Sequence, residues 1–423
     1  MINRLLVAFL VLTTVSLSAQ RNNSSPYSFF GIGENFKPKT VEQASMGGIG
    51  VAMKENQYLN FINPAATADI RVSTYGLGGL VSFLTLKEAD ASQSGNTTSL
   101  QYIALGFPIG KKAGFSAGLQ PSTTVGYSLI NEMLDVDGEI TEITRNSGNG
   151  GTTRLYGSFG MYVFDGFSLG IEAAYTFGTI EREVLNQRAN VALATKYYEE
   201  TTIRGGEVKL GAQYKTKLKK GLELSTGAAI KFSNELNQTG NKSLYSLSFS
   251  NSGFEIPRDT VYSDPYKGTF KNPIQTIIGF GLGKQNKWYV GLNSEFQQAF
   301  QDTSNSANYA FENSIRTSIG GYYIPKINSI SSYWDRVTYR AGLRIENTGL
   351  LIRNGNNYEP INDFGINVGL GLPLPKQLSN LNLGFEYGQR GTTNNNLIKE
   401  NYFNVRLSLS LNDINWFKKR EID

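Results

Sequence analysis

Histidine and cysteine are both absent from the 423 residues, which limits the chemistry that the side chains can perform. Nucleophilic Ser/His/Asp and Cys/His groups and the usual zinc sites require these residue types. A carboxylate pair for acid and base chemistry remains conceivable, and Glu172 with Glu207 on neighbouring predicted strands is one example. Because Lys209 and several arginines share their face, we interpret the pair as part of an ion-pair network. We therefore expect no enzyme, no catalytic residue and no cofactor.

Two further motifs look chemical but favour structural interpretations. Asp135, Asp137 and Glu139 resemble part of a calcium loop, but the remaining ligands do not follow at the required spacing. The glycine clusters at residues 47–50 and 76–79 superficially resemble phosphate-binding loops, but the second follows no βαβ pattern, and packing and bending explain glycines in a barrel more simply. We predict no metal site and no phosphate site. The net charge of +5 is modest and the lysines are scattered, so we also expect no nucleic-acid partner.

The first residues are typical of an export signal. Arg4 precedes an apolar run over residues 5–18, and small residues then lead to Ala19. A basic start, a short apolar run and a small-residue cleavage point define a secretory signal peptide, which we predict over residues 1–19. No later run reaches the roughly 18 apolar residues expected of a membrane-spanning helix.

From Ser73 onward, apolar and polar residues alternate with the period of two that is typical of strands with two different faces. In the last predicted strand, Phe403 and Leu407 share one face, whereas Asn404 and Arg406 share the other. Fourteen such segments begin near Ser73, Thr98, Ala113, Thr153, Phe167, Thr201, Gly221, Asn272, Asn286, Ser314, Arg336, Phe364, Leu381 and Asn401.

The number of strands and the lengths of their connections point to one architecture. An even number of strands is expected of a single-chain outer-membrane barrel, whose short turns alternate with long outer loops. Short connections such as residues 164–166 alternate here with long polar segments, which we predict to be loops at residues 130–151, 181–200, 237–271 and 347–363. A soluble sandwich or propeller has no reason to keep this alternation. The fold class is therefore all-β, a 14-stranded antiparallel transmembrane β-barrel over residues 73–412.

The two faces of the predicted strands differ in charge. One face carries Leu, Val, Ile, Phe and Tyr with almost no charge, as contact with outer-membrane lipid and lipopolysaccharide requires. The other face carries the ionisable residues, among them Arg340, Arg344, Glu386 and Arg406, which we predict to be polar residues of the lumen.

Residues 20–72 do not follow the strand pattern and are too few to form a core of their own. A short helix is predicted over residues 41–46, ending at Gly47 and Gly48, because helices commonly stop at glycine. Asn63 followed by Pro64 has the pattern of a helix start, with Asn as the cap and Pro at the first helical position.

This segment resembles the N-terminal hatch of the FadL family of outer-membrane barrels, which includes the PorV-type barrels of the type IX secretion system. The resemblance rests on Ala-Ser-Met-Gly-Gly-Ile-Gly-Val-Ala at residues 44–52 and Asn-Phe-Ile-Asn-Pro-Ala at residues 60–65. It implies a plug inside a 14-stranded barrel, with Gly47, Gly48, Asn63, Pro64 and Ala65 as plug or gate residues. Residues 411–420 also resemble barrels with a short tail, and we predict a periplasmic tail over residues 413–423.

The resemblance implies the passage of hydrophobic small molecules across the outer membrane of a Gram-negative cell, with a sideways exit at a kink in the third strand. The third predicted strand contains Gln120, Pro121 and Ser122. Proline cannot donate a hydrogen bond to a neighbouring strand. We predict a lateral opening at these three residues.

A second hypothesis assigns the chain no transport activity. It would then be a barrel subunit of an outer-membrane secretion or barrel-assembly complex, with other outer-membrane proteins as partners, as PorV-type barrels are. A third possibility, a general porin, is disfavoured by the predicted hatch, which would obstruct an open pore.

Overall fold

The computed structural model describes residues 23–88, 91–301, 308–355, 357–375, 379–394 and 397–413. The predicted signal peptide, residues 1–19, and the predicted tail beyond Asp413 lie outside these residues. Within the described chain, no helix is long and apolar enough to cross a bilayer. The strands are β1 Glu34–Asn35, β2 Ser73–Lys87, β3 Ser92–Ile109, β4 Ala113–Leu134, β5 Ile140–Phe164, β6 Phe167–Arg188, β7 Ala194–Lys217, β8 Glu223–Lys231, β9 Asn234–Phe249, β10 Glu255–Asn272, β11 Gln275–Lys284, β12 Trp288–Gln297, β13 Tyr309–Phe311, β14 Ser314–Tyr323, β15 Thr338–Asn354, β16 Asn357–Pro373, β17 Asn380–Arg390 and β18 Lys399–Asp413. The helices are η1 Pro26–Phe29, α2 Val41–Ala44, η2 Pro64–Asp69, η3 Lys219–Gly221 and η4 Trp334–Arg336.

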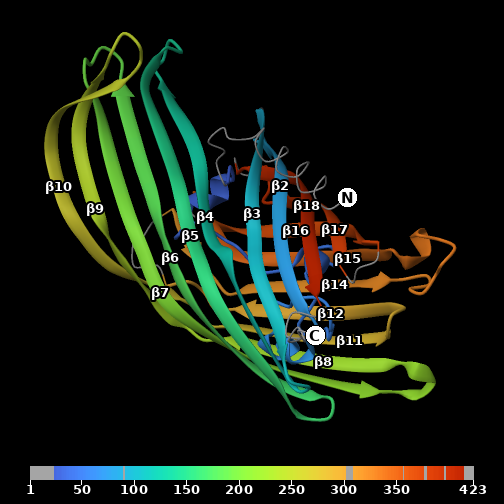
Figure 1. The fold of residues 1–423 in the computed structure, drawn as a ribbon. Coiled ribbons are helices and arrows are strands. Elements are labelled where there is room, and N and C mark those ends of the chain that lie inside the picture. The colour runs from blue at the N-terminus through green and yellow to red at the C-terminus, as the bar shows by residue number, and fades with distance from the viewer. Residues whose placement is uncertain are drawn as a thin grey trace, which may run out of the picture.

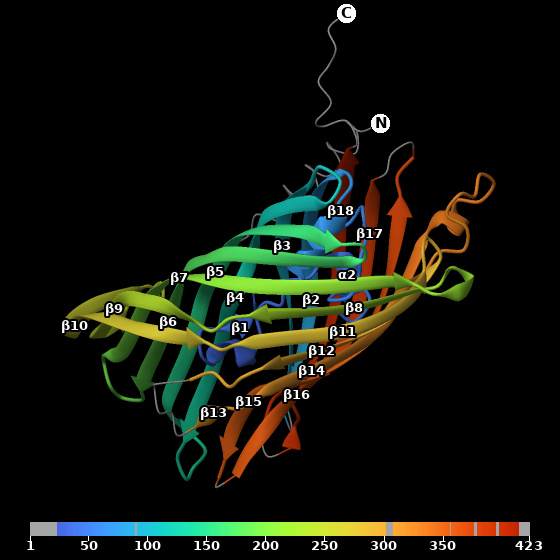
Figure 2. The same cartoon turned by 90° about the horizontal axis from the view of Figure 1, so that it is seen from below.

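One antiparallel sheet closes into a barrel because β18 pairs with β2 along its whole length (Figures 1 and 2). Three barrel strands are interrupted, so that β8 continues into β9, β10 into β11 and β13 into β14. In each case both parts pair along the same neighbouring strand. β1 belongs to the N-terminal segment. The remaining strands form a closed 14-stranded antiparallel barrel, as predicted.

The barrel wall has the two faces that the alternation predicts. Phe403 and Leu407 of β18 are 43% and 39% exposed on the outside, whereas Asn382 and Ser408 on the inside are buried. An outward arginine or lysine would cost roughly 2–4 kcal/mol at the middle of a bilayer. The apolar outer face and the closed hydrogen bonding between strands make this chain a transmembrane β-barrel.

The prediction of long outer loops was wrong, because most of these residues continue the barrel strands as hairpins. Figure 1 shows β4 to β7, β9 and β10 rising together as a tall curved sheet, which we call the outer sheet. Polar residues occur on both faces of these hairpins, so the regular apolar stripe that identifies a membrane strand is interrupted there. The hairpins extend to Leu134↔Ile140 for β4 and β5, Asn186↔Thr195 for β6 and β7, Phe249↔Glu255 for β9 and β10, and Arg353↔Tyr358 for β15 and β16.

Side chains hold the outer sheet together near its tips. Lys196 lies 2.6 Å from Glu183 and 2.8 Å from Glu255, and Arg145 lies 3.6 Å from Glu255. Burial by itself would raise the pKa of Glu183, but hydrogen bonds from Lys196 and Ser147 outweigh it and hold that pKa below its usual value. A small apolar cluster of Leu185, Ala194 and Leu247 packs beside these charges. The outer sheet is thus a packed structure.

The N-terminal segment, residues 23–72, folds inside the barrel. Thr40 and Gln43 form a reciprocal capping box that starts α2. The helix ends at Ala44, slightly earlier than the predicted residue 46, and Gly47 and Gly48 follow with φ of +72° and +88°. These left-handed conformations suit glycine because it has no Cβ. The predicted Asn-Pro helix start is confirmed as η2, a short 3₁₀ helix whose cap is Asn63.

A belt of inward-facing glycines lets the N-terminal segment touch the barrel backbone. A Cβ atom at Gly211 would lie 2.0 Å from Asn63 Oδ1, and one at Gly342 would lie 2.2 Å from the carbonyl carbon of Met46. Thirteen of the fourteen barrel strands contribute a glycine to this contact, which we call the glycine belt. Its members are Gly76, Gly106, Gly114, Gly160, Gly170, Gly211, Gly227, Gly279, Gly291, Gly320, Gly342, Gly369 and Gly384.

A methyl group on the glycine belt should loosen the N-terminal segment. We expect Gly211→Ala to destabilise the folded protein by about 1–3 kcal/mol, because the new methyl overlaps Asn63. Urea unfolding of the detergent-solubilised barrel measures the loss. Gly206→Ala on the same strand is the matched control, since its Cβ would meet nothing closer than 3.8 Å. Equal stability of the two variants would contradict this account of the belt.

Candidate functional site: the outer cavity and the wall seam

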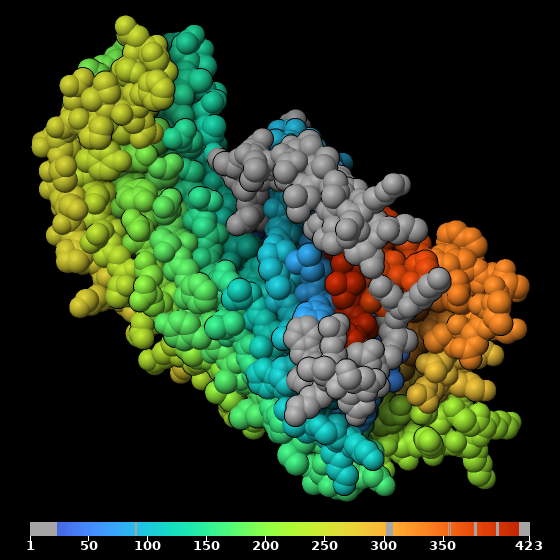
Figure 3. Space-filling model, viewed as in Figure 1, coloured from blue at the N-terminus to red at the C-terminus, as the bar shows by residue number. Residues whose placement is uncertain are grey.

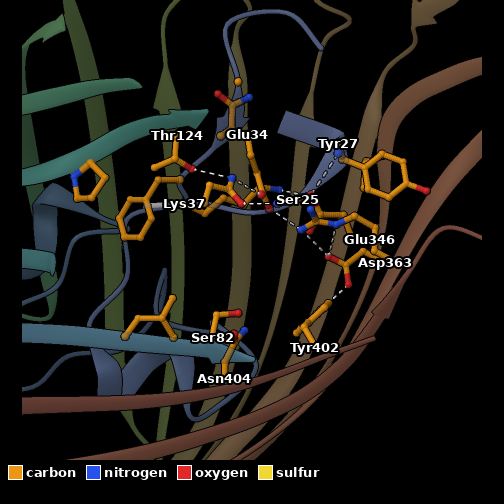
Figure 4. A pocket seen from close by; sticks show the side chains of 18 of the residues that line it. Ser25, Tyr27, Glu34, Lys37, Ser82, Thr124, Glu346, Asp363, Tyr402 and Asn404 are labelled. Atoms are coloured by element: carbon orange, nitrogen blue, oxygen red, sulfur yellow. Dashed lines mark hydrogen bonds and ion pairs between the residues drawn. The ribbon is translucent and has the colours of Figure 1, made fainter. Parts of the chain in front are cut away.

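A cavity of about 350 Å³ lies between the N-terminal segment and the inner faces of the strands at the hairpin end of the barrel. We call it the outer cavity, and Figure 4 shows part of its lining. Ser25, Glu34 and Lys37 face it from the N-terminal segment, while Ser82 and Asn404 face it from β2 and β18. The outer cavity therefore exists only because the N-terminal segment supplies one of its walls.

Paired charges line the side of the outer cavity that β15 to β18 form. Arg344 lies 2.9 Å from Glu386, 3.2 Å from Asp363 and 3.5 Å from Glu346. Arg406 lies 2.5 Å from the other oxygen of Glu386. Charges buried in this way are tolerated because each has a partner.

The structure brings together three of the four predicted lumen residues, namely Arg344, Glu386 and Arg406. Arg340 lies apart from them, because it faces a second cavity at the short-turn end of the barrel. There it donates to Asn382 at 3.1 Å.

The sequence interpretation missed several charged residues that anchor the N-terminal segment. Arg390 lies 2.7 Å from Glu34 and 3.6 Å from Glu400, and Ser25 donates to Glu400 at 2.5 Å. Lys37 pairs with Glu346. For Arg390 and Glu400 a signal existed, since Arg390 continues the polar alternation of its strand by one step and Glu400 continues that of its strand by two, beyond Tyr402. Glu34 and Lys37 lie in a segment without periodicity and gave no signal.

Two neutral amide atoms in the outer cavity have no hydrogen-bond partner among the described residues. They are Asn367 Nδ2 and Asn404 Oδ1, both buried. Buried polar atoms normally find a partner, so an unpaired donor and acceptor beside a cavity can bind a polar group of a guest molecule. Arg344, Arg390 and Arg406, which also line the cavity, are paired with carboxylates of the barrel.

The barrel wall is split beside the outer cavity. Pairing between β3 and β4 ends at Ile103↔Leu119, although β3 stays paired with β2 to Ser92 and β4 stays paired with β5 to Leu134. We call the unpaired stretch, residues 92–102 against residues 120–134, the wall seam. Figure 3 shows the outer sheet standing away from the surface of β2 and β3. Within a bilayer, such unpaired edges must be covered or kept above the hydrocarbon.

The residues predicted as a lateral opening lie where the wall seam begins. Gln120 and Pro121 remain paired with β5, and a bulge follows Pro121 at Ser122. Pro121 lines the outer cavity, whereas Gln120 is buried, with both side-chain amide atoms lacking a partner among the described residues.

A strand of the N-terminal segment occupies the start of the wall seam. β1 pairs with the free edge of β4 through Glu34↔Thr124 and Asn35↔Thr123. Phe36 then donates its backbone N–H to the carbonyl of Ser122 at 2.9 Å. The edge that β3 leaves free is therefore partly closed by the same segment that forms a wall of the outer cavity.

The predicted gate residues pack against opposite walls of the lumen. Asn63 Nδ2 donates to Ala212 and Ala228 at 3.1 and 3.3 Å, which ties the segment to β7 and β8. Pro64 and Ala65 lie against Gly170 of β6. Gly47 and Gly48 lie on the other side, where Arg316 of β14 donates to the carbonyl of Gly47 at 3.3 Å.

The acidic pair considered in the sequence lies in a buried ion network. Glu172 contacts Arg154 and lies 2.9 Å from Lys209, while Glu207 lies 3.2 Å from Arg154. Lys209 also donates to the carbonyl of Phe61 at 2.8 Å, which ties this network to the N-terminal segment. The arrangement supports a structural role for both carboxylates.

Solved structures define the class of this barrel. The toluene transporter TodX of Pseudomonas putida is 15% identical with a TM-score of 0.58, over 90% of this chain and 99% of that chain. The toluene transporter TbuX of Ralstonia pickettii is 15% identical with a TM-score of 0.57, over 91% and 100%. A FadL homologue of Pseudomonas aeruginosa is 13% identical with a TM-score of 0.55, over 89% and 98%. The chain thus has the fold of FadL-like barrels.

The family assignment is more specific than the fold. A sequence model of the family described as BamG matches residues 1–423. The chain belongs to the BamG family. No curated protein matches the sequence.

Removing the shared carboxylate of the outer cavity should destabilise the barrel. We expect Glu386→Gln to lower the free energy of unfolding by about 3–5 kcal/mol, because Arg344 and Arg406 lose a buried partner. Urea unfolding provides the measurement. Glu142→Gln is the control, since Glu142 pairs with the exposed Arg188 and such pairs contribute about 0–1 kcal/mol. A similar loss of unfolding free energy in both variants would show that the ion pairs of Glu386 contribute little to stability.

Proposed function

We propose that this BamG-family barrel lies in the outer membrane and passes hydrophobic small molecules from the cell exterior into the membrane. A ligand enters the outer cavity from the hairpin end and leaves sideways through the wall seam. The observation that carries the proposal is that Pro121, where the seam begins, also lines the outer cavity. In this orientation the short turns face the periplasm, and residues 1–19 are the export signal.

The outer cavity has two chemically different sides, which suits such a ligand. Leu80, Leu84 and Pro121 lie on the side of the wall seam, whereas the paired charges lie on the side of β15 to β18. Small-molecule sites combine apolar walls with a few polar groups that fix orientation. TodX and TbuX, which share the fold, are described as toluene transporters, and this supports a hydrophobic ligand.

A sideways route fits the packing of the N-terminal segment, to which we assign the role of plug. Met46, Val51 and Ala65 are 0% exposed inside the barrel, so the middle of the lumen is filled. A ligand that leaves through the wall does not need to pass this region. β1 then controls the exit, because its pairing with Thr123 and Thr124 must loosen or be bypassed.

Filling the outer cavity should block passage. Ser82→Trp places a large side chain in the cavity beside the wall seam, whereas Phe83→Trp, one residue away, changes only the outer face. We expect influx of the hydrophobic dye N-phenyl-1-naphthylamine into intact cells to rise with the natural protein and with Phe83→Trp. With Ser82→Trp it should fall to the level of cells without the protein. Equal influx through both variants would refute the route.

A second candidate function is that of a non-transporting subunit in an outer-membrane secretion or barrel-assembly complex. The observation that favours it is the outer sheet, whose tips expose apolar side chains on a packed support. Phe254 is 74% exposed, Val261 66% and Val136 fully exposed. Large exposed apolar groups on a protein surface commonly mark binding sites for other proteins.

Co-purification distinguishes the second function from the first. If the tips bind a partner, Phe254→Ser should reduce the amount of other outer-membrane proteins recovered with the barrel in stoichiometric amounts from native membranes. Ile330→Ser is the control, because Ile330 is fully exposed at the opposite, short-turn end. Recovery of the barrel alone, before and after substitution, would exclude a stable complex.

A further inference from the structure

The upper part of β3 has a free strand edge beside the wall seam. From Ser92 to Tyr102, β3 pairs with β2 on one side, and no strand of the described chain pairs with its other side. In Figure 1 this end of β3 stands apart from β4. Residues 92–102 extend over about 35 Å at the usual rise of a β-strand. Alternate residues of such an edge present backbone N–H and C=O groups that have no strand partner.

This edge lies at and above the outer boundary of the apolar band. The side chains of its outward face, Thr98, Asn96 and Ser94, are polar and exposed. Phe83, which pairs with Asn96, lies beside Phe403 with 6.5 Å between the ring centres, as in the aromatic girdle of a membrane barrel. Other polypeptides can therefore reach the edge from the water at the hairpin end of the barrel.

A second long edge, that of β10 at the margin of the outer sheet in Figure 1, is protected against pairing. β10 pairs with β9 on one side, and on its other side the described residues form only the bridge Lys271↔Gln301. β10 carries prolines and charges, which are common devices against the association of strand edges. They are Pro257, Arg258, Asp259, Asp264, Pro265 and Lys267. Residues 92–102 of β3 contain neither proline nor a charged residue, so this edge lacks the same protection.

The edge of β4 across the wall seam shows that an extended segment can be added in this gap. β1 pairs with Thr123 and Thr124, and Gly126 donates its backbone N–H to Ser28 Oγ at 3.1 Å. The N-terminal segment thus occupies part of the β4 side of the gap and leaves the β3 side free. A strand that joins β3 would extend this kind of pairing further toward the hairpin end.

We propose that the free edge of β3 binds an extended, uncharged segment of another polypeptide, which adds to the sheet as an antiparallel strand in the place that β4 leaves. The small, uncharged side chains at residues 92–99 favour a partner that binds mainly through its backbone. A second copy of the chain fits poorly through β3, because barrels with one orientation in a membrane align these strands in parallel. Binding at this edge does not require either function proposed above.

The absence of cysteine from the chain makes disulfide trapping of a weakly bound peptide possible. The probe is the uncharged peptide Thr-Val-Thr-Ser-Thr-Val-Ser-Cys-Ser with blocked ends. Its cysteine faces residue 94 when the rest of the peptide lies antiparallel to residues 95–101. The control peptide carries N-methyl groups on the backbone nitrogens of its threonines and valines, which removes donors on both of its edges.

Two matched serine substitutions compare the open edge with the protected one. Ser94→Cys lies on β3 and Ser263→Cys on β10; both serines are exposed, and each lies within 3.0 or 3.1 Å of one hydroxyl on the paired strand. The full-length barrel in lipid nanodiscs is incubated with each peptide in a thiol–disulfide buffer, and intact-protein mass spectrometry measures the adduct. We expect at least about tenfold more adduct at Ser94→Cys than at Ser263→Cys, because only the first edge supplies several backbone hydrogen bonds.

N-methylation should lower the adduct at Ser94→Cys to the level found at Ser263→Cys. If Ser94→Cys prevents folding, Asn96→Cys, on the same face of β3, replaces it. Equal yields at the two edges would overturn the proposal, and so would a yield at β3 that N-methylation leaves unchanged, since binding would then not use the backbone. An edge covered by lipid would give little adduct with either peptide, and this result would also overturn it.

Discussion

Close contact between two backbones is the constraint on which the rest of this structure depends. The N-terminal segment fills the lumen without a core of its own, and it does so because the barrel presents the glycine belt to it. At Gly211 and Gly342 a side chain would occupy the space of Asn63 and Met46. Close packing of this kind leaves few voids, so even one added methyl group lowers the stability of the folded protein. The high glycine content, 46 of 423 residues, thus has a structural cause in addition to turns.

The close contact between the N-terminal segment and the barrel also explains why the strands keep their structure at the wall seam. A strand edge without a partner exposes backbone donors and acceptors, and the segment held by the glycine belt provides replacements for some of them. β1 pairs with Thr123 and Thr124, and Phe36 donates to Ser122. The N-terminal segment, the outer cavity and the wall seam are therefore mechanically linked, because residues 34–36 contribute to all three. Movement of this short stretch would change the outer cavity and the wall seam together.

The sequence predicted the barrel well because alternation directly records which face meets lipid. The rule placed Asn404 and Arg406 on the inner face, and both side chains line the outer cavity, while the Asn63–Pro64 helix start followed from local capping chemistry. The sequence did not predict the hairpins of the outer sheet, because backbone hydrogen bonds hold them together. Such bonds do not require a regular apolar stripe in the sequence. The anchoring pairs of Arg390 with Glu34 and Glu400 were also beyond reach, since they join residues far apart in sequence. Pairing across such distances depends on barrel closure, which no local pattern encodes.

The electrostatics of the outer cavity narrow the chemistry of a guest molecule. Six basic and five acidic side chains line it, and most are paired with one another, as Arg344 is with Glu346, Asp363 and Glu386. A charged guest would have to compete with these pairs and also lose its own hydration. Among the neutral side chains of the cavity, the donor of Asn367 and the acceptor of Asn404 lack a partner within the described chain. Together with the apolar side that faces the wall seam, these two atoms suit a polar group that is carried on a hydrophobic body.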